Sequence, residues 1–196
     1  CRMKIITILC LVLLSVHSYS QEVVTRVETV TRDGLIYHQL STEPLTGTVV
    51  SFHEDGRLRI GRNYVDGKRD GLSETFYNNG QLESRGNFKD GKGDGLLELF
   101  DEDGQLESRL NYKNGKLEGL WEDFDEDGQL ESRLNYKNGK LDGLLESFHE
   151  NGQLSNRRHY IDDKLEGLSE LFGEDGNVIG TRTYRNGELV ETNENP

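Results

Sequence analysis

The chain has 196 residues, with 36 acidic and 23 basic side chains and a formal net charge of −13. Only 33% of the residues are hydrophobic, well below the fraction in ordinary globular domains, which argues against a large multi-layered core. A charge this negative also argues against partners such as nucleic acid or an anionic membrane surface, because both require a positive protein surface.

Residues 1–20 have the layout of an export signal. A short basic start is followed by an apolar run over residues 5–16 and by the small residues Ser18 and Ser20. The run is shorter than the roughly 20 apolar residues that a membrane-spanning helix needs. The alternative interpretation is a buried N-terminal helix. We expect residues 1–20 to be a signal peptide, and the mature chain from Gln21 to be exported to the periplasm, the cell surface or the extracellular medium.

The next segment, residues 21–46, is expected to form an N-terminal β cap. Residues 23–30 are rich in valine and threonine, as is typical of a strand. Asp33 and Gly34 then predict a turn before a short returning strand.

A repeat fills most of the remaining chain. Glycine recurs every 24 residues from Gly47 to Gly167, and two further glycine series share the same spacing. Six units result over residues 47–190, and such a fixed period is the signature of a repeat array. Residues 191–196 are polar and are expected to be a disordered tail.

Each unit predicts two short antiparallel strands joined by tight turns. Pairs such as Asn114-Gly115 match the positive φ that a two-residue hairpin turn demands. Helices are disfavoured because a glycine falls about every dozen residues. The predicted fold is all-β: an elongated antiparallel β-hairpin array of about twelve strands that forms one twisted sheet.

Two aromatic columns are expected to hold the units together. Both fall at even positions of the unit, as do two leucines, so we expect them to share one buried face, with the odd positions facing water. The expected repeat core is Phe52, Phe76, Phe100, Phe124, Phe148 and Phe172, with Tyr64, Phe88, Tyr112, Tyr136, Tyr160 and Tyr184.

The repeats resemble a known family. The stretches from Phe100 to Gly119 and from Phe124 to Gly143 are similar to the variant MORN repeat, and the leader from Asp33 to Gly47 resembles the opening of bacterial YwqK-family antitoxin components. The resemblance implies an array of β-hairpins that acts as an interaction scaffold, and the antitoxin label implies a toxin partner. An exported chain would not meet a cytoplasmic toxin.

A column of glutamates offers a candidate partner-binding surface. It occupies the fourth position of five units, on the face expected to be apolar: Glu74, Glu98, Glu122, Glu146 and Glu170. The column is interpreted either as rim residues that pair with a cross-strand arginine or lysine, or as a row of carboxylates for a cationic partner. Trp121, at an odd and therefore water-facing position, is interpreted either as a second candidate contact or as a residue that fills a local gap.

A weak calcium candidate lies in the fourth unit. Asp123, Asp125, Asp127 and Gly128 copy the start of a calcium loop, but Leu134 stands where such a loop needs a glutamate. An acidic hairpin turn is the favoured interpretation. We expect no metal, no cofactor and no catalytic site, because the histidines are scattered and no nucleophile lies in a known motif.

The leading functional hypothesis is therefore a non-enzymatic, exported repeat scaffold. It would bind a protein or a peptide along an elongated β face, since an array can gain a unit without disrupting a unique pocket. The resemblance suggests the alternative of an antitoxin-like or immunity-like protein that neutralises a toxin. A surface protein that binds a small ligand or a polysaccharide through Trp121 is a third hypothesis.

Overall fold

The computed structural model describes residues 22–194 and contains one long sheet. The signal peptide predicted for residues 1–20 lies outside the described residues. The elements are β1 (Glu22–Thr25), a 3-10 helix η1 (Arg26–Glu28), β2 (Thr29–Arg32), β3 (Leu35–His38), β4 (Gly47–Phe52), β5 (Leu58–Val65), β6 (Lys68–Phe76), β7 (Leu82–Lys89), β8 (Lys92–Phe100), β9 (Leu106–Lys113), β10 (Lys116–Phe124), β11 (Leu130–Lys137), β12 (Lys140–Phe148), β13 (Leu154–Ile161), β14 (Lys164–Leu165), β15 (Gly167–Phe172), β16 (Val178–Arg185) and β17 (Glu188–Glu194).

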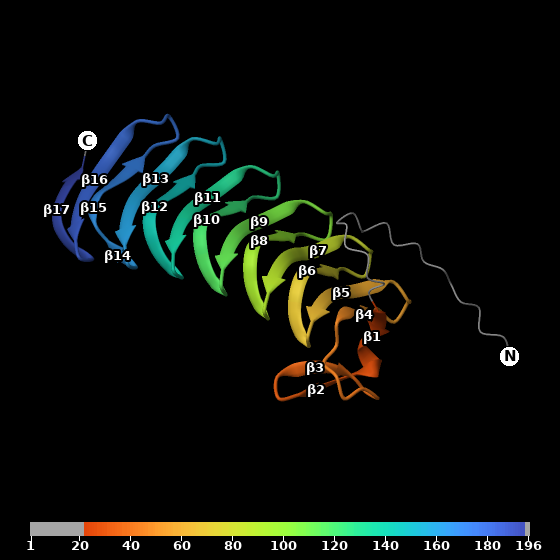
Figure 1. The fold of residues 1–196 in the computed structure, drawn as a ribbon. Helices are drawn as coiled ribbons and strands as arrows, with labels where there is room; N and C mark the ends of the chain where they lie inside the picture. Colours follow the sequence, from red (N-terminus) through yellow and green to blue (C-terminus); the bar gives the residue numbers. More distant parts are fainter. Residues whose placement is uncertain (1–21, 195–196) are drawn as a thin grey trace.

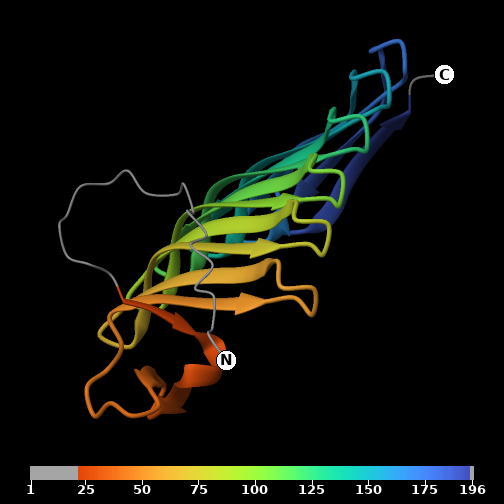
Figure 2. The ribbon, with the colours of Figure 1, turned by 90° about the vertical axis from the view of Figure 1, so that its right-hand side faces the viewer.

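The predicted hairpin array is confirmed. The strands from β4 onward pair with their neighbours in sequence order, and every one of these pairs is antiparallel. Figure 1 shows the curved strands lying side by side along the array, and Figure 2 shows that the sheet twists from one end to the other. The exception to antiparallel pairing is β1, which lies parallel to β4.

The two-residue turns follow the sequence prediction. Asn114 and Gly115 have φ values of 51° and 81°, as a two-residue turn with two positive φ angles requires. The N–H of Gly115 also donates to the carbonyl of Gly93 at the start of β8, in the preceding unit's hairpin end. Asp163 takes the place of this glycine in the fifth unit, with a φ of 68°, and its N–H keeps the equivalent bond to Leu141 O. The turns therefore tie each unit to the one before it.

The tail prediction is wrong for residues 191–194. They belong to β17, which pairs with β16 and places Glu191 opposite Thr183. Strand β17 occupies the positions at which the next repeat would begin, so it continues the ladder by one strand beyond the twelve expected. Residues 195 and 196 lie outside the described part of the chain.

The most buried apolar cluster lies at the N-terminal end, where β1 and the segment before β4 meet the first unit. It contains Val24, Leu45, Val49 and Tyr64, with Ile36 packed against it. Parallel pairing brings β1 so close to β4 that a Cβ at Gly47 would lie 2.3 Å from Glu22 O. The N-terminal segment thus covers the first edge of the sheet, which an exposed ladder would otherwise leave open to association.

Candidate functional site

The long sheet has two chemically different faces, and the prediction that both aromatic columns share one of them is wrong. Leu97 pairs with Leu110, whereas Glu98 pairs with Arg109, so even positions of one strand face odd positions of the next. Between β8 and β9 the bulge between Leu99 and Phe100 causes this change, and between β9 and β10 a two-residue turn does, because it sets Lys113 opposite Lys116, three residues later. We call the two sides the tyrosine face, which carries the Tyr112 column, and the phenylalanine face, which carries the Phe100 column.

The phenylalanine face carries an alternating ladder of glutamates and arginines. Arg85 Nε donates to Glu98 Oε2 at 2.5 Å, and Arg109 Nε makes the same bond to Glu122. The ladder runs across successive strands in the order Glu74, Arg85, Glu98, Arg109, Glu122, Arg133, Glu146, Arg157 and Glu170. Pairing with a cross-strand arginine, the first of the two interpretations of the glutamate column, is therefore what the structure shows for Glu98 and Glu122.

Each ladder arginine also lies over a phenylalanine of the following unit. The distances from guanidinium carbon to ring centroid are 5.7 Å for Arg85 and Phe100 and 5.5 Å for Arg109 and Phe124, within the range of cation–π contacts. Four phenylalanines are half-buried beneath these arginines: Phe100, Phe124, Phe148 and Phe172. Phe76 is half-buried without such a contact, and Phe52 is 44% exposed. Those four phenylalanines are thus covered by charged side chains as well as by their neighbours in the column.

Other sequence expectations for this face are wrong. The leucines at the second position of the unit were expected to be buried, but Leu96, Leu120, Leu144 and Leu168 are all exposed.

At the start of the ladder, Glu74 lies opposite Gly61 and Arg85. Burial raises the pKa of Glu74 above its usual value, and the charge of Arg85 opposes that shift. The glutamate column is therefore not a uniform row of free carboxylates.

Trp121 lies on the tyrosine face and is half-buried, so its predicted water-facing position is wrong. It stands between Leu110 and Leu134 of the adjacent strands, and its ring centroid lies 5.7 Å from that of Tyr136. Its Nε1–H donates to Asp123 Oδ1 at 2.7 Å. Trp121 is thus fixed in orientation within an apolar strip.

Asp123 is held by hydroxyl groups as well as by Trp121. Ser108 Oγ donates to Asp123 Oδ1 at 2.6 Å, and Ser132 Oγ donates to Asp123 Oδ2 at 3.1 Å. Sequence reasoning missed this network, because it treated Asp123 only as part of an acidic turn. The aspartate replaces leucine or serine of neighbouring units, and the simultaneous appearance of tryptophan two residues earlier is the signal that could have revealed it.

The weak calcium candidate is not assembled. Asp125 Oδ1 accepts hydrogen bonds from the backbone N–H groups of Asp127 and Gln129, which is the geometry of an acidic hairpin turn. Asp123 is occupied by the network described above. Within residues 22–194, no group of three or more acidic, histidine or cysteine side chains is placed to hold a metal ion.

The tyrosine face has a charge opposite to that of the whole chain. In strands β5 to β16 its side chains include one carboxylate, Asp123, and four arginines: Arg62, Arg69, Arg158 and Arg182. The arginines lie towards the two ends of the array, and the leucines and aromatics around Trp121 lie between them. This face is therefore an apolar strip with cationic ends.

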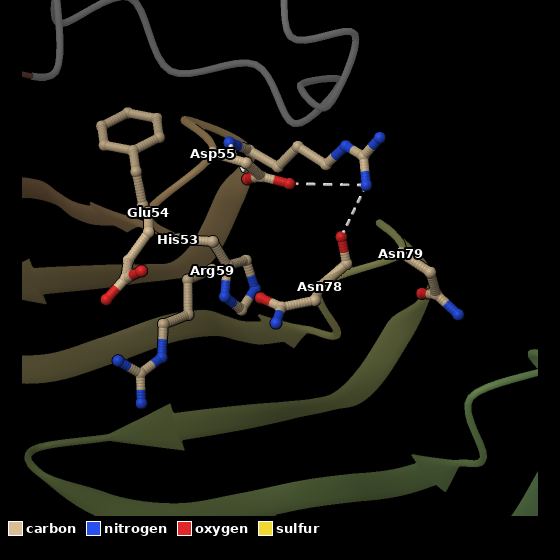
Figure 3. A pocket seen from close by; sticks show the side chains of 8 residues that line it. His53, Glu54, Asp55, Arg59, Asn78 and Asn79 are labelled. Atoms are coloured by element: carbon tan, nitrogen blue, oxygen red, sulfur yellow. Dashed lines mark hydrogen bonds and ion pairs between the residues drawn. The ribbon is translucent and has the colours of Figure 1, made fainter.

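The longer turns, which lie at the opposite ends of the strands from the two-residue turns, also carry contacts between units. His53 Nε2 lies 2.8 Å from Phe76 O, and His149 makes the same contact with Phe172 O. Beside His53, a polar groove of about 590 Å³ is crossed by Arg57, whose Nη1 donates to Asn78 O at 2.7 Å (Figure 3). His53 and His149 thus join successive hairpins.

Comparison with known proteins agrees with this architecture. Four segments of the chain match the MORN repeat variant. The matched residues are 69–90, 93–114, 117–138 and 141–162. Each segment covers two strands and the turn between them, and ends at the first residue of a two-residue turn. These MORN repeats recur every 24 residues, in phase with the glycine series. No curated protein matches the chain.

Two matched solved structures are of one protein, TarM. The crystal structure of a point mutant of S. aureus TarM in complex with fondaparinux, alpha-GlcNAc-glycerol and UDP is 12% identical, with a TM-score of 0.35 over 61% of this chain and 21% of that one. A crystal structure of TarM is 15% identical, with a TM-score of 0.33 over 49% and 19% of the two chains. The match thus spans only about a fifth of either TarM chain.

Among the described residues, no helix is long and apolar enough to cross a membrane.

Proposed function

We propose that this protein is an exported, non-enzymatic repeat scaffold that binds a partner protein or peptide along its tyrosine face. The MORN repeats support the scaffold part of this proposal, because each unit contributes the same kind of surface. Export follows from the signal layout of residues 1–20.

The observation that carries the choice of face is its charge. In a chain with a net charge of −13, the tyrosine face presents four arginines and one hydrogen-bonded aspartate. On the opposite face, by contrast, ladder arginines such as Arg133 and Arg157 are already paired with glutamates. The unpaired positive charge is therefore concentrated on one side of the sheet.

The chemistry of this face defines the partner. Leu97, Leu134 and Leu145 flank Trp121 at half-buried positions, and apolar side chains of a partner would bury them further. Arg158 and Arg182 are exposed beyond this strip, where carboxylates of the partner would pair with them. The partner is thus an acidic protein segment with an apolar centre. A toxin with such a segment would satisfy the antitoxin-like alternative.

Two neighbouring residues test the face. Trp121→Leu changes the tyrosine face and introduces the residue type that the adjacent units have at this repeat position, as in Leu97 and Leu145. Leu120→Thr changes the phenylalanine face and introduces the residue type that the first unit has at this position, Thr48. Affinity capture from the native cell envelope with the wild-type mature chain should retain an acidic protein. Arg158→Leu combined with Arg182→Leu should abolish capture, Trp121→Leu should weaken it, and Leu120→Thr should leave it unchanged.

Fluorescence of the captured complex gives a second measurement. Trp121 is the single tryptophan of the chain, so its emission reports on this face directly. A partner on the tyrosine face should shift the emission to shorter wavelength. Loss of capture in Leu120→Thr together with an unchanged Trp121 emission would place the partner on the other face and overturn the proposal.

A further inference from the structure

A cavity of about 260 Å³ lies between the N-terminal segment and the first repeat, away from the Trp121 strip. Its walls come from η1, β2 and β3 on one side and from β4 and β5 on the other. Figure 1 shows β2 and β3 placed beside the first strands of the sheet. The cavity is therefore formed by parts of the chain that are distant in sequence and meet only in the fold.

Two buried hydrogen-bonding groups in this cavity have no partner among residues 22–194. They are Arg62 Nε and Ser51 Oγ. Both residues lie on the tyrosine face, where Arg62 pairs with Val49 and Ser51 pairs with Ile60, so they are diagonal neighbours about 7 Å apart. Leaving a buried donor unpaired is destabilising, and two such groups facing one cavity call for an explanation.

The charges around the cavity are all positive. Arg26 reaches its rim from η1, and Arg62 lies in its wall. Burial first, and then the charges of Arg69 and Arg26, hold the pKa of Arg62 below its usual value. Glu28, the carboxylate within η1, is instead hydrogen-bonded to Thr25 N and Oγ1. In an acidic protein, this cluster of arginines has no carboxylate among the described residues to balance it.

The remaining walls add hydroxyl groups and an apolar surface. Thr29, Thr31 and Tyr64 supply hydroxyls, while Ile36 and Ile60 supply hydrocarbon. A guanidinium with nearby hydroxyls is a strong donor set for an oxyanion, and the hydrocarbon wall suits an organic group attached to it.

We propose that this cavity binds a small organic oxyanion, a carboxylate or a phosphate monoester, with its charged group on Arg62 and Ser51 and its organic part against Ile36 and Ile60. The site uses Arg62 at the N-terminal end of the tyrosine face, whereas the proposed partner contacts, Trp121, Arg158 and Arg182, lie farther along the array. Occupation would tie the N-terminal segment to the first repeat, because the ligand would contact both. Ligand binding would therefore stabilise the N-terminal end of the array.

The repeat itself supplies the decisive variant. Arg62 occupies the position at which the third and fourth units have Leu110 and Leu134, so Arg62→Leu is compatible with the strand. Arg59→Leu is the matched control, because it removes the same charge from an exposed position of β5 on the other face. Phenyl phosphate, benzoate and inorganic phosphate serve as probes, with phenol and sodium chloride at equal ionic strength as controls.

Titration calorimetry and thermal unfolding give the expected result. Wild type and Arg59→Leu should bind phenyl phosphate or benzoate more tightly than inorganic phosphate and should unfold at higher temperature when it is bound. Arg62→Leu should bind at least about tenfold more weakly, a loss of about 1.4 kcal/mol. Without any probe, Arg62→Leu should unfold at higher temperature than wild type, because a half-buried charge that lacks an ion pair among the described residues has been removed.

The contrary results are equally specific. Equal binding by wild type and Arg62→Leu, or no binding by wild type at 10 mM probe (on the order of a 3 kcal/mol interaction or less), would overturn the proposal. If Arg62→Leu fails to fold, as judged by circular dichroism, Ser51→Ala takes its place and should weaken binding severalfold. Loss of the partner protein in Arg158→Leu with phenyl phosphate binding intact would separate this site from the proposed function.

Discussion

The carboxylate of Glu146 accepts a hydrogen bond from Arg133 Nε at 2.6 Å on the phenylalanine face of the long sheet. Arg157 Nε donates to the other carboxylate oxygen at 2.8 Å, and Glu146 is only 3% exposed. Two arginines thus bury a glutamate from opposite sides. The ladder places charged side chains where the sequence pattern predicts an apolar face.

Glu146→Gln should destabilise the protein. The glutamine keeps an acceptor for one arginine but loses the charge shared by both, at a cost of about 1–3 kcal/mol. Glu122→Gln is the matched control, because Glu122 has one hydrogen-bonded arginine and a more exposed side chain. Urea unfolding at neutral pH should rank Glu146→Gln as the less stable variant, and the reverse order would contradict the role of the second arginine.

The pH dependence of two ladder glutamates should have opposite signs. Burial favours a higher pKa for Glu146, but hydrogen bonds from Arg157 and Arg133 lower it below its usual value, so its stabilising contribution is complete above about pH 4.5 and disappears as the pH falls through the folded pKa. Burial raises the pKa of Glu74, so its ionisation costs stability as the pH rises from about 4.5 through the folded pKa. Thermal unfolding at pH 7 should show Glu74→Gln stabilised and Glu146→Gln destabilised, and both differences should shrink at pH 3.

Phe124→Ala should cost more than Phe52→Ala. Phe124 is half-buried beneath Arg109, whereas Phe52 is 44% exposed and no arginine lies over it. For Phe124 we expect a loss of about half of the 3–5 kcal/mol that truncation of a fully buried phenylalanine costs. For Phe52 we expect a loss of less than about 1 kcal/mol. Equal losses measured by urea unfolding would mean that neighbouring units, and not the arginine, provide the burial.

Deletion of residues 119–142 should leave a folded and shorter protein. The deletion joins Glu118 to Gly143, which preserves the junction between repeats and the register of the remaining strands. Removal of residues 131–142 is the control, because it takes out a single strand and so reverses the direction of those that follow. Circular dichroism and size-exclusion chromatography should show a native-like sheet for the first deletion and loss of cooperative unfolding for the second.

The mature protein should begin at Gln21. The small residues Ser18 and Ser20 match the positions that signal peptidase reads. N-terminal sequencing of protein from the cell envelope or the medium tests this expectation. Material that is found only in the cytoplasm and that begins at Met3 would contradict it.

The amino-acid sequence determined the period, the strands and the two-residue turns of this protein. Glycine spacing fixes the unit length, and Asn114-Gly115 selects a positive-φ turn through local backbone sterics. The length of that turn also contained the information that even positions would face odd ones. The strands and the turn type are local properties, so one copy of the repeat is enough to specify them.

The tertiary structure decided which side chains meet on each face. The register of strand pairing shifts between Leu117 and Trp121 and again between Asp123 and Phe124. Alternation of side chains along one strand therefore does not predict which side chains align across the next strand. Only the assembled strands place Arg133 beside Glu146, and only the folded N-terminal segment encloses Arg62 in a cavity. The physical reason is that these contacts depend on register and docking over many residues, whereas turns and strands depend on neighbours in the chain.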